Sequence, residues 1–304
     1  MMSMRGRDLV SIKDLSKEEI LNLLVRAEEM KKESPGPILK GHILASCFYE
    51  PSTRTRLSFE AAMKRLGGEV IGFADAATTS LQKGESLQDA MKIMGYYSDI
   101  MVIRHPKEGS AWEAAVASDT PVINGGDGAN EHPTQTLLDL FTIQECQGRL
   151  QGLKVGFVGD LLNGRTVHSL VPTLGMLDSR FYFVAPQSLE MPSAICQNLR
   201  QVGVPFSFHR TIEEIIGKVD VLFMTRIQQE RFVSHEEYLK VKDHFVLTEA
   251  MLRSAQPHLK ILHPLPRVNE IDRGVDKTPY AYYFQQAQNG LWVRQALLAM
   301  LLGR

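Results

Sequence analysis

Short apolar runs alternate with helical patterns along most of the chain. Six runs have the length and composition of buried strands, and they are residues 43–49, 100–103, 121–123, 154–158, 219–224 and 260–262. Continuous apolar runs that are separated by helices are typical of parallel strands covered on both faces. The pattern therefore predicts an α/β fold with two doubly wound domains, each built on a mostly parallel sheet flanked by helices.

Three helices can be placed from the same pattern. The first stops at Gly67-Gly68, and its apolar positions recur at helical spacing at Phe59, Ala62, Met63 and Leu66. The second begins at Pro133, because proline suits the first position of a helix. The third runs from about Tyr283 to Leu302.

The length of the chain, 304 residues, suits two domains better than one. A polar stretch with two glycines, residues 144–152, separates the two sets of strands and is where we expect the boundary. The last helix comes after the second set, so the pattern alone allows it to pack on either domain.

Polar residues follow each of the six predicted strands. These segments are residues 50–56, 104–106, 124–135, 159–166, 225–228 and 263–267. In parallel α/β sheets, ligands bind outside the carboxyl ends of the strands. Because polar segments follow all six strands, they predict a binding site that is assembled from these segments.

The segment Ser52-Thr53-Arg54-Thr55-Arg56 lies between a strand and a helix. Hydroxyls and free backbone N–H groups at a helix start attract anions, and the helix dipole adds to this attraction. Arg54 offers a bidentate clamp for a phosphate. The alternative is an ordinary Ser/Thr cap beside a solvated arginine. The position at a strand end favours the phosphate site.

His132 and Gln135 lie at the start of the helix that begins at Pro133. There, His132 would stay neutral and donate a hydrogen bond to a carbonyl oxygen, because the positive end of a helix disfavours a second positive charge. Gln135 offers a neutral amide to an amide-like group. The alternative is a capping histidine without a chemical role.

Residues Gly159 to Thr166 nearly match the phosphate-binding loop G-x-x-x-x-G-K-[ST]. Arg165 replaces the lysine, however, and a carboxylate clamp suits an arginine better. Arg226 is a second arginine at a strand end, so the pair favours a dicarboxylate. The polar loop 78–86 has the composition of a mobile surface loop.

Composition and charge exclude several classes of protein. The net charge of −1 argues against a general binder of nucleic acid. No apolar run reaches the ~18 residues of a membrane span, and no signal peptide is recognised. We therefore expect a cytoplasmic protein with neither a membrane nor a nucleic-acid partner.

The cysteines and the other metal-binding residue types are dispersed. Cys47, Cys146 and Cys196 have the pattern of small buried residues in a reducing compartment. The histidines that follow strands are far apart in sequence, and no convincing metal set is found. We expect no metal and no cofactor.

The strand-end motifs occur in the order in which the carbamoyltransferases carry them. They are Ser-Thr-Arg-Thr-Arg (52–56), Arg-His-Pro (104–106), His-Pro-Thr-Gln (132–135), Gly-Arg-Thr-Val-His-Ser (164–169), Met-Thr-Arg-Ile-Gln (224–228) and His-Pro-Leu-Pro-Arg (263–267). The chain resembles the catalytic chains of aspartate carbamoyltransferases over nearly its whole length. Ornithine carbamoyltransferases usually have a cysteine in place of Thr134 and a His-Cys-Leu-Pro motif instead of His263 to Pro266.

The resemblance implies carbamoyl phosphate and L-aspartate as substrates. Ser52, Thr53, Arg54 and Thr55 would bind the phosphate, with help from Arg104. Thr55, Arg104 and His132 would hold the carbonyl oxygen, where negative charge builds as the amine attacks.

The remaining roles follow from the same resemblance. Gln135 and the backbone carbonyls of Pro264 and Leu265 would hold the carbamoyl NH₂ group, next to a cis Leu265-Pro266 peptide bond. The two carboxylates of aspartate would be held by Arg165, Arg226 and Gln228.

The resemblance also implies an assembly. Ser80 and Lys83 would enter the active site of a neighbouring chain, so their loop would be more than a mobile surface loop. The working unit would then be a homotrimer with shared active sites. Residues 1–145 with 285–304 would bind carbamoyl phosphate, and residues 146–284 would bind aspartate. Whether regulatory chains bind stays open.

One departure and three rival functions remain. Many relatives carry a lysine and an aromatic residue where this chain has Leu162 and Asn163. The contacts that those relatives make on domain closure are therefore not carried over to this chain. The rivals are a nucleotide-binding protein built on Gly159 to Thr166, a non-catalytic scaffold, and a carbamoyltransferase for ornithine or N-acetylornithine.

Overall fold

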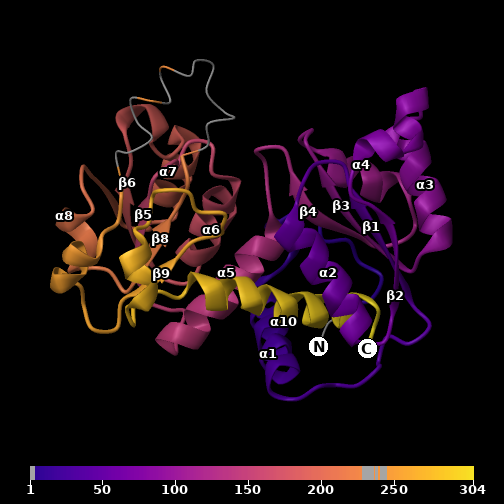
Figure 1. Cartoon of the computed structure of the whole chain (residues 1–304), viewed down its shortest axis with the longest axis horizontal. Coiled ribbons are helices and arrows are strands. Elements are labelled where there is room, and N and C mark those ends of the chain that lie inside the picture. Colours follow the sequence, from indigo (N-terminus) through magenta and orange to yellow (C-terminus); the bar gives the residue numbers. More distant parts are fainter. Residues whose placement is uncertain (1–3, 228–235, 237–238, 240–244) are drawn as a thin grey trace. The chain divides into compact units, whose positions relative to one another are not determined.

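The computed structural model describes residues 4–227, 236, 239 and 245–304. It consists of two compact units. Unit 1 is Met1–Phe141 with Gln288–Arg304, and unit 2 is Thr142–Ala287. Each unit has its own parallel sheet flanked by helices (Figure 1).

Unit 1 is built on a sheet with the strand order β2-β1-β3-β4, in which every neighbouring pair is parallel. Its strands are β1 (Ile43–Phe48), β2 (Glu69–Phe73), β3 (Ile100–His105) and β4 (Val122–Asp127). Its helices are η1 (Ile12–Asp14), α1 (Lys17–Lys32), α2 (Thr53–Arg65), η2 (Ala76–Thr78), η3 (Ser80–Lys83), α3 (Leu87–Tyr97), α4 (Ser110–Ala117), most of α5 (Pro133–Gln147) and most of α10 (Tyr283–Leu301).

Helices cover both faces of the unit 1 sheet. Successive residues of a strand point to opposite faces. Ala45 and Cys47 of β1 pack in one apolar cluster with Met91 of α3. Between them, the Ser46 hydroxyl donates a hydrogen bond to Glu60 of α2 at 3.1 Å. A sheet covered on both faces explains why β1 is a continuous apolar run rather than an alternating one.

Unit 2 is built on a parallel sheet with the strand order β7-β6-β5-β8-β9. Its strands are β5 (Lys154–Val158), β6 (Arg180–Val184), β7 (Phe206–His209), β8 (Val221–Met224) and β9 (Lys260–Leu262). Its helices are α6 (Arg165–Gly175), η4 (Gln187–Leu189), α7 (Ser193–Gln201), α8 (Glu213–Ile216), η6 (Glu249–Ser254) and η7 (Arg273–Lys277), besides the end of α5 and the start of α10.

Aromatic rings form part of the unit 2 core. Phe157 of β5 is fully buried, and its ring centroid lies 5.9 Å from that of Phe181 on β6 and 5.6 Å from that of Phe223 on β8. These side chains belong to three adjacent strands, so they tie the centre of the sheet together.

The predicted fold class and all six predicted strands are confirmed. The predicted helices correspond to α2, α5 and α10, and α5 does begin at Pro133. Three further strands were not predicted. β2 and β7 lie at the ends of their sheets and are partly exposed, so neither is a continuous apolar run. β6 is buried over Phe181–Val184, and the same criterion would have found it.

Candidate active site

In each sheet, the chain order reverses once next to the first strand. In unit 1, β1 has β2 on one side and β3 on the other, and in unit 2, β5 lies between β6 and β8. Ligands of such sheets bind at the carboxyl ends of the strands that flank this switch point. The predicted residues lie at the ends of those strands: Ser52 to Thr55 follow β1, Arg104 is the last residue but one of β3, Arg165 follows β5 and Arg226 follows β8.

The start of α2 is open to an anion. Ser52 is the N-cap, but its side chain makes no capping hydrogen bond, and the first turn carries no acidic residue. Ser52 is half-buried, and Thr53 and Arg54 are exposed. Surrounding atoms still desolvate part of the Arg54 guanidinium, which lowers its pKa. Since an arginine stays charged nonetheless, the helix start combines free N–H groups, hydroxyls and a cation.

Arg104 is held in place by two acceptors. Its Nε donates to Glu50 Oε1 at 2.7 Å, and one terminal nitrogen donates to the Gly125 carbonyl oxygen at 3.3 Å. β1 and β3 are adjacent, and Phe48 is paired in register with Arg104. The carboxyl ends of these strands therefore bring Arg104 to the same sheet edge as Ser52.

His132 and Thr55 meet in the interior of unit 1. The His132 Nε2 atom lies 3.4 Å from the Thr55 hydroxyl, and His132 Nδ1 lies 3.5 Å from the Thr134 hydroxyl. His132 is 4% exposed and Thr55 is 7% exposed. The structure thus joins two segments 77 residues apart that the sequence analysis assigned to one group.

The side-chain amide nitrogen of Gln135 donates a hydrogen bond to a carboxylate. Its Nε2 donates to Asp139 Oδ1 at 2.8 Å, one helical turn further along α5. A carboxylate only accepts hydrogen bonds, so this contact fixes which end of the Gln135 amide is occupied. The Gln135 oxygen is left as the end that can accept from an NH₂ group. Sequence reasoning missed Asp139, although its i, i+4 spacing from Gln135 was a usable signal.

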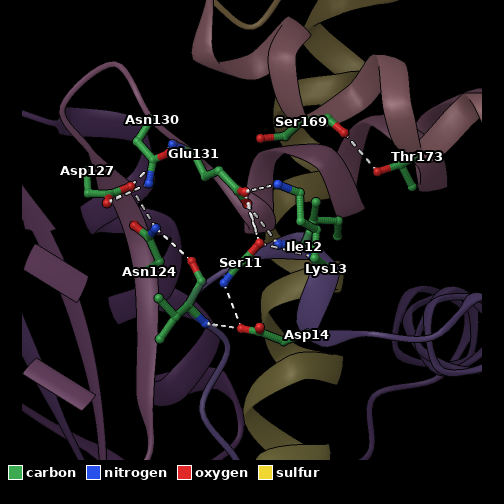
Figure 2. Close-up of polar contacts among 11 residues, drawn as sticks. Ser11, Ile12, Lys13, Asp14, Asn124, Asp127, Asn130, Glu131, Ser169 and Thr173 are labelled. Carbon is green, nitrogen blue, oxygen red and sulfur yellow. Dashed lines mark hydrogen bonds and ion pairs between the residues drawn. The ribbon is translucent and has the colours of Figure 1, made fainter. Parts of the chain in front are cut away.

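The loop that leads into His132 is anchored on the N-terminal segment, as Figure 2 shows. Glu131 accepts hydrogen bonds from the Ser11 hydroxyl at 2.8 and 2.9 Å and from the Ile12 backbone N–H at 3.0 Å. Asp127 accepts from Asn124 and Asn130 in the same loop. These contacts fix the backbone immediately before the histidine.

Ser80 and Lys83 lie in η3, within the loop between β2 and α3. Both residues are exposed. Their placement fits the expected surface loop and leaves both side chains accessible to other molecules.

Arg165 is the first residue of α6 and is half-buried. The loop before it is tied down because the buried Asp160 carboxylate accepts from the backbone N–H and the side chain of Asn163. Asp160 occupies the backbone N–H of Asn163, which a phosphate would need in a phosphate-binding loop. The arrangement therefore disfavours the nucleotide-binding alternative. It also gives Asn163 a structural role, while Leu162 is 43% exposed.

Backbone contact brings the ends of β5 and β8 together. Gly159 has φ +114°, and a Cβ atom there would lie 2.3 Å from the Thr225 carbonyl oxygen. The Thr225 hydroxyl donates to the Val158 carbonyl oxygen at 2.9 Å. This contact places Arg226, which is half-buried, next to the loop that carries Arg165. The predicted residue Gln228 lies outside the described residues.

The segment after β9 is shaped by a buried hydrogen bond between His263 and Glu270. His263 Nδ1 accepts from the Leu265 backbone N–H at 2.8 Å, so the other ring nitrogen carries the proton and donates to Glu270 Oε1 at 2.7 Å. The Leu265-Pro266 bond is cis, as expected, and Leu265 has φ +52°. Pro264 and Leu265 are thereby held in one backbone conformation. Glu270 was not found from the sequence.

A cavity of about 740 Å³ opens elsewhere in unit 2. Its lining residues are Ala185, Pro186, Gln187, Ser188, Arg210, Thr211 and Phe245, which include no predicted site residue. It lies beside the ends of β6 and β7 rather than at the switch point between β5 and β8, so we place the chemistry at the switch point.

Among the described residues we find neither a cluster that could hold a metal nor a membrane-spanning helix, and the cysteines are unpaired. In the described part of the chain, no group of three or more His, Cys, Asp or Glu residues is arranged to hold a metal ion. No helix among the described residues is long and apolar enough to cross a membrane. The three cysteines are free, and burial raises the pKa of Cys47 and Cys146 to about 12, so these thiols stay protonated at neutral pH.

Comparison with known proteins matches both halves of the chain. Residues 7–145 match the family model "Aspartate/ornithine carbamoyltransferase, carbamoyl-P binding domain", and residues 151–301 match "Aspartate/ornithine carbamoyltransferase, Asp/Orn binding domain". The aspartate carbamoyltransferase catalytic subunit of Chromobacterium violaceum is 53% identical over 299 residues, which cover 98% of this chain and 99% of the relative.

Solved structures agree. The catalytic subunit of M. jannaschii aspartate transcarbamoylase has a TM-score of 0.92 at 48% identity and covers 98% of both chains. The enzyme from Trypanosoma cruzi, in complex with carbamoyl phosphate and aspartate, has a TM-score of 0.93 at 36% identity, again over 98% of both chains. The chain therefore belongs to the aspartate/ornithine carbamoyltransferase family.

Proposed function

We propose that this protein transfers the carbamoyl group of carbamoyl phosphate to the amine of L-aspartate, which gives N-carbamoyl-L-aspartate and phosphate in pyrimidine biosynthesis. The observation that carries the proposal is the pair of switch points, each flanked by the predicted substrate-binding residues. The preference for aspartate is supported by relatives of this chain that are aspartate carbamoyltransferases.

Unit 1 supplies most of the carbamoyl phosphate residues, and Pro264 and Leu265 of unit 2 supply the others. Ser52, Thr53, Arg54 and Thr55 bind the phosphate through the open start of α2, with Arg104 beside them. Thr55, Arg104 and His132 hold the carbonyl oxygen, and Gln135 accepts from the carbamoyl NH₂ group together with the backbone carbonyls of Pro264 and Leu265. The orientation of Gln135 toward Asp139 supports this last role.

Unit 2 supplies the aspartate residues. Arg165 and Arg226 clamp the two carboxylates, with Gln228 as a third partner. Residues 1–145 with 285–304 form the carbamoyl phosphate domain, and residues 146–284 form the aspartate domain. The end of the first family model at residue 145 and the membership of Gln288–Arg304 in unit 1 support this division.

The mechanism follows from charge and position. Both substrates are anions, and Arg54, Arg104, Lys83, Arg165 and Arg226 supply five positive charges in a chain of net charge −1. The amine attacks the carbamoyl carbon, negative charge builds on the carbonyl oxygen, and the C–O bond to phosphate breaks. The donors around that oxygen stabilise this charge. The leaving phosphate takes the amine proton, so no protein nucleophile is needed.

The working unit is a homotrimer in the cytoplasm, in which Ser80 and Lys83 complete the active site of a neighbouring chain. Their exposure in η3 supports this role. Mixing an inactive Ser52 variant with an inactive Lys83→Ala variant should restore activity after subunit exchange. No recovery would contradict shared sites.

One assay tests the substrates. The purified chain receives carbamoyl phosphate with aspartate, ornithine or N-acetylornithine, and the carbamoylated product is measured. We expect turnover only with aspartate. Turnover with another amine would reassign the acceptor, and no turnover with any would favour a scaffold. A phosphonate joined to aspartate should also bind far more tightly than aspartate alone.

A further inference from the structure

Unit 1 contains a buried arginine that contacts Thr134, between His132 and Gln135 in the sequence, and that the proposed mechanism does not use. Arg294 lies on α10 and is 3% exposed. One terminal nitrogen donates to the Gly290 carbonyl oxygen at 3.1 Å, and its guanidinium carbon lies 5.0 Å from the ring centroid of Phe59 on α2. An ion buried at such cost needs compensation from specific partners.

The first partner connects Arg294 to His132. The other terminal nitrogen of Arg294 donates a long hydrogen bond, 3.4 Å, to the Thr134 hydroxyl. Arginine only donates, so Thr134 accepts here and keeps its own hydrogen for another acceptor. The His132 Nδ1 atom lies 3.5 Å from the Thr134 oxygen and is such an acceptor. His132 then carries its proton on Nε2, the nitrogen next to Thr55.

The second partner connects Arg294 to Gln135. The charge of Asp139 interacts favourably with Arg294 and opposes the lowering of the arginine pKa to about 10 by burial. The interaction with Arg294 favours the charged form of Asp139, and a carboxylate in that form can only accept the hydrogen bond that Gln135 Nε2 donates at 2.8 Å. Asp139 therefore holds the Gln135 amide with its nitrogen inward and its oxygen available.

We propose that Arg294 is a positioning residue that sets His132 as a hydrogen-bond donor and Gln135 as a hydrogen-bond acceptor. This inference rests on the proposed function, because a carbamoyl group offers a carbonyl oxygen to a donor and an NH₂ group to an acceptor. Arg294 thus prepares a donor for the carbonyl oxygen and an acceptor for the NH₂ group of the carbamoyl group, without contacting the substrate itself.

The test is a double-mutant cycle on kcat. Arg294→Met keeps the length and apolar packing of the side chain but removes its charge and donors, and Thr134→Val removes the hydroxyl at nearly constant volume. Each variant should lower kcat by at least about tenfold, which is less than the ~100-fold or more expected for loss of an oxyanion donor itself. The double variant should lose no more than the worse single variant, because Thr134 acts through a contact that Arg294→Met already removes.

The matched control is Gln295→Met. Gln295 is the next residue of α10, is equally buried at 3% exposed, and its side-chain oxygen has no hydrogen-bond partner. Its replacement should leave kcat within about twofold of the wild type, as for a site uncoupled from the chemistry. Circular dichroism and thermal unfolding identify the folded variants.

A spectroscopic readout separates this inference from the proposed function. The ¹⁵N NMR spectrum of histidine-labelled protein, assigned with His132→Asn, reports which ring nitrogen is protonated. We expect Nε2–H in the wild type and a mixture of tautomers in Arg294→Met. A wild type without carbamoyl transfer would refute the proposed function, whereas the spectra would still decide the role of Arg294. Near-normal kcat in folded Arg294→Met or Thr134→Val, multiplying losses in the double variant, or an unchanged tautomer would overturn the inference.

Discussion

The two units position their candidate residues by different means. In unit 1, Thr55, His132 and Gln135 are buried, and neighbouring side chains determine what their polar atoms donate or accept. In unit 2, Arg165 and Arg226 follow segments whose shape is set by close backbone contact at Gly159. Substitutions should therefore alter chemistry in unit 1 and backbone shape in unit 2.

The largest effect is expected where the backbone of unit 2 is tightest. Gly159→Ala places a Cβ atom 2.3 Å from the Thr225 carbonyl oxygen at a φ of +114°. The overlap and the strained backbone should together lower the free energy of unfolding by about 3 kcal/mol or more. Urea unfolding followed by circular dichroism measures this loss.

Gly203→Ala is the matched control for that substitution. Gly203 also has a positive φ, +73°, but a Cβ atom there would meet nothing within 4 Å. Only the backbone penalty remains, about 1 kcal/mol. Equal losses in the two variants would show that close contact at Gly159 does not shape unit 2.

The next effect should change chemistry and leave the fold intact. Arg54→Ala removes an exposed cation at the start of α2, so stability should hardly change. Turnover should fall by more than ~100-fold, the scale of losing a group that stabilises the transition state. Lys64→Ala, at the exposed far end of the same helix, should keep normal turnover. A near-normal rate in Arg54→Ala would refute the phosphate role.

The sequence predicts elements and motifs better than the contacts behind them. The interior strand runs and the start of α5 at Pro133 are local signals, and they were readable. The edge strands β2 and β7 were missed because a strand with a partner on one side needs less apolar surface. Arg294 could not be predicted as a site residue, because its contact with Thr134 spans 160 positions and depends on the packing of α10.

A moderate effect is expected at the buried hydrogen bond between His263 and Glu270 in unit 2. Glu270 accepts from His263 and from the backbone N–H groups of Val268 and Asn269. Glu270→Gln places an NH₂ group against one of these donors. One buried donor then loses its acceptor, which should lower the free energy of unfolding by about 1–3 kcal/mol. Chemical unfolding of both proteins at neutral pH measures the difference.

The pH dependence of that difference checks its cause. Burial raises the pKa of Glu270, but hydrogen bonds from His263 and the backbone outweigh burial, and the pKa is lowered overall. A lowered folded-state pKa contributes stability above the unfolded-state pKa, and this contribution is lost as pH falls toward the lowered value. The gap between wild type and Glu270→Gln should therefore narrow in acid. A gap that is constant with pH would contradict a stabilising role for the ionised Glu270 carboxylate.

The smallest effect should separate anchoring from simple capping in unit 1. Ser11 and Ser16 each cap a helix with a reciprocal capping box, so alanine at either position should lower the free energy of unfolding by about 1 kcal/mol. Only Ser11 also donates to Glu131, the residue directly before His132. Ser11→Ala should therefore reduce kcat by about twofold through a looser histidine, while Ser16→Ala should not. Equal kcat values would mean that the backbone before His132 is held without Ser11, and that side-chain contacts alone orient the unit 1 residues.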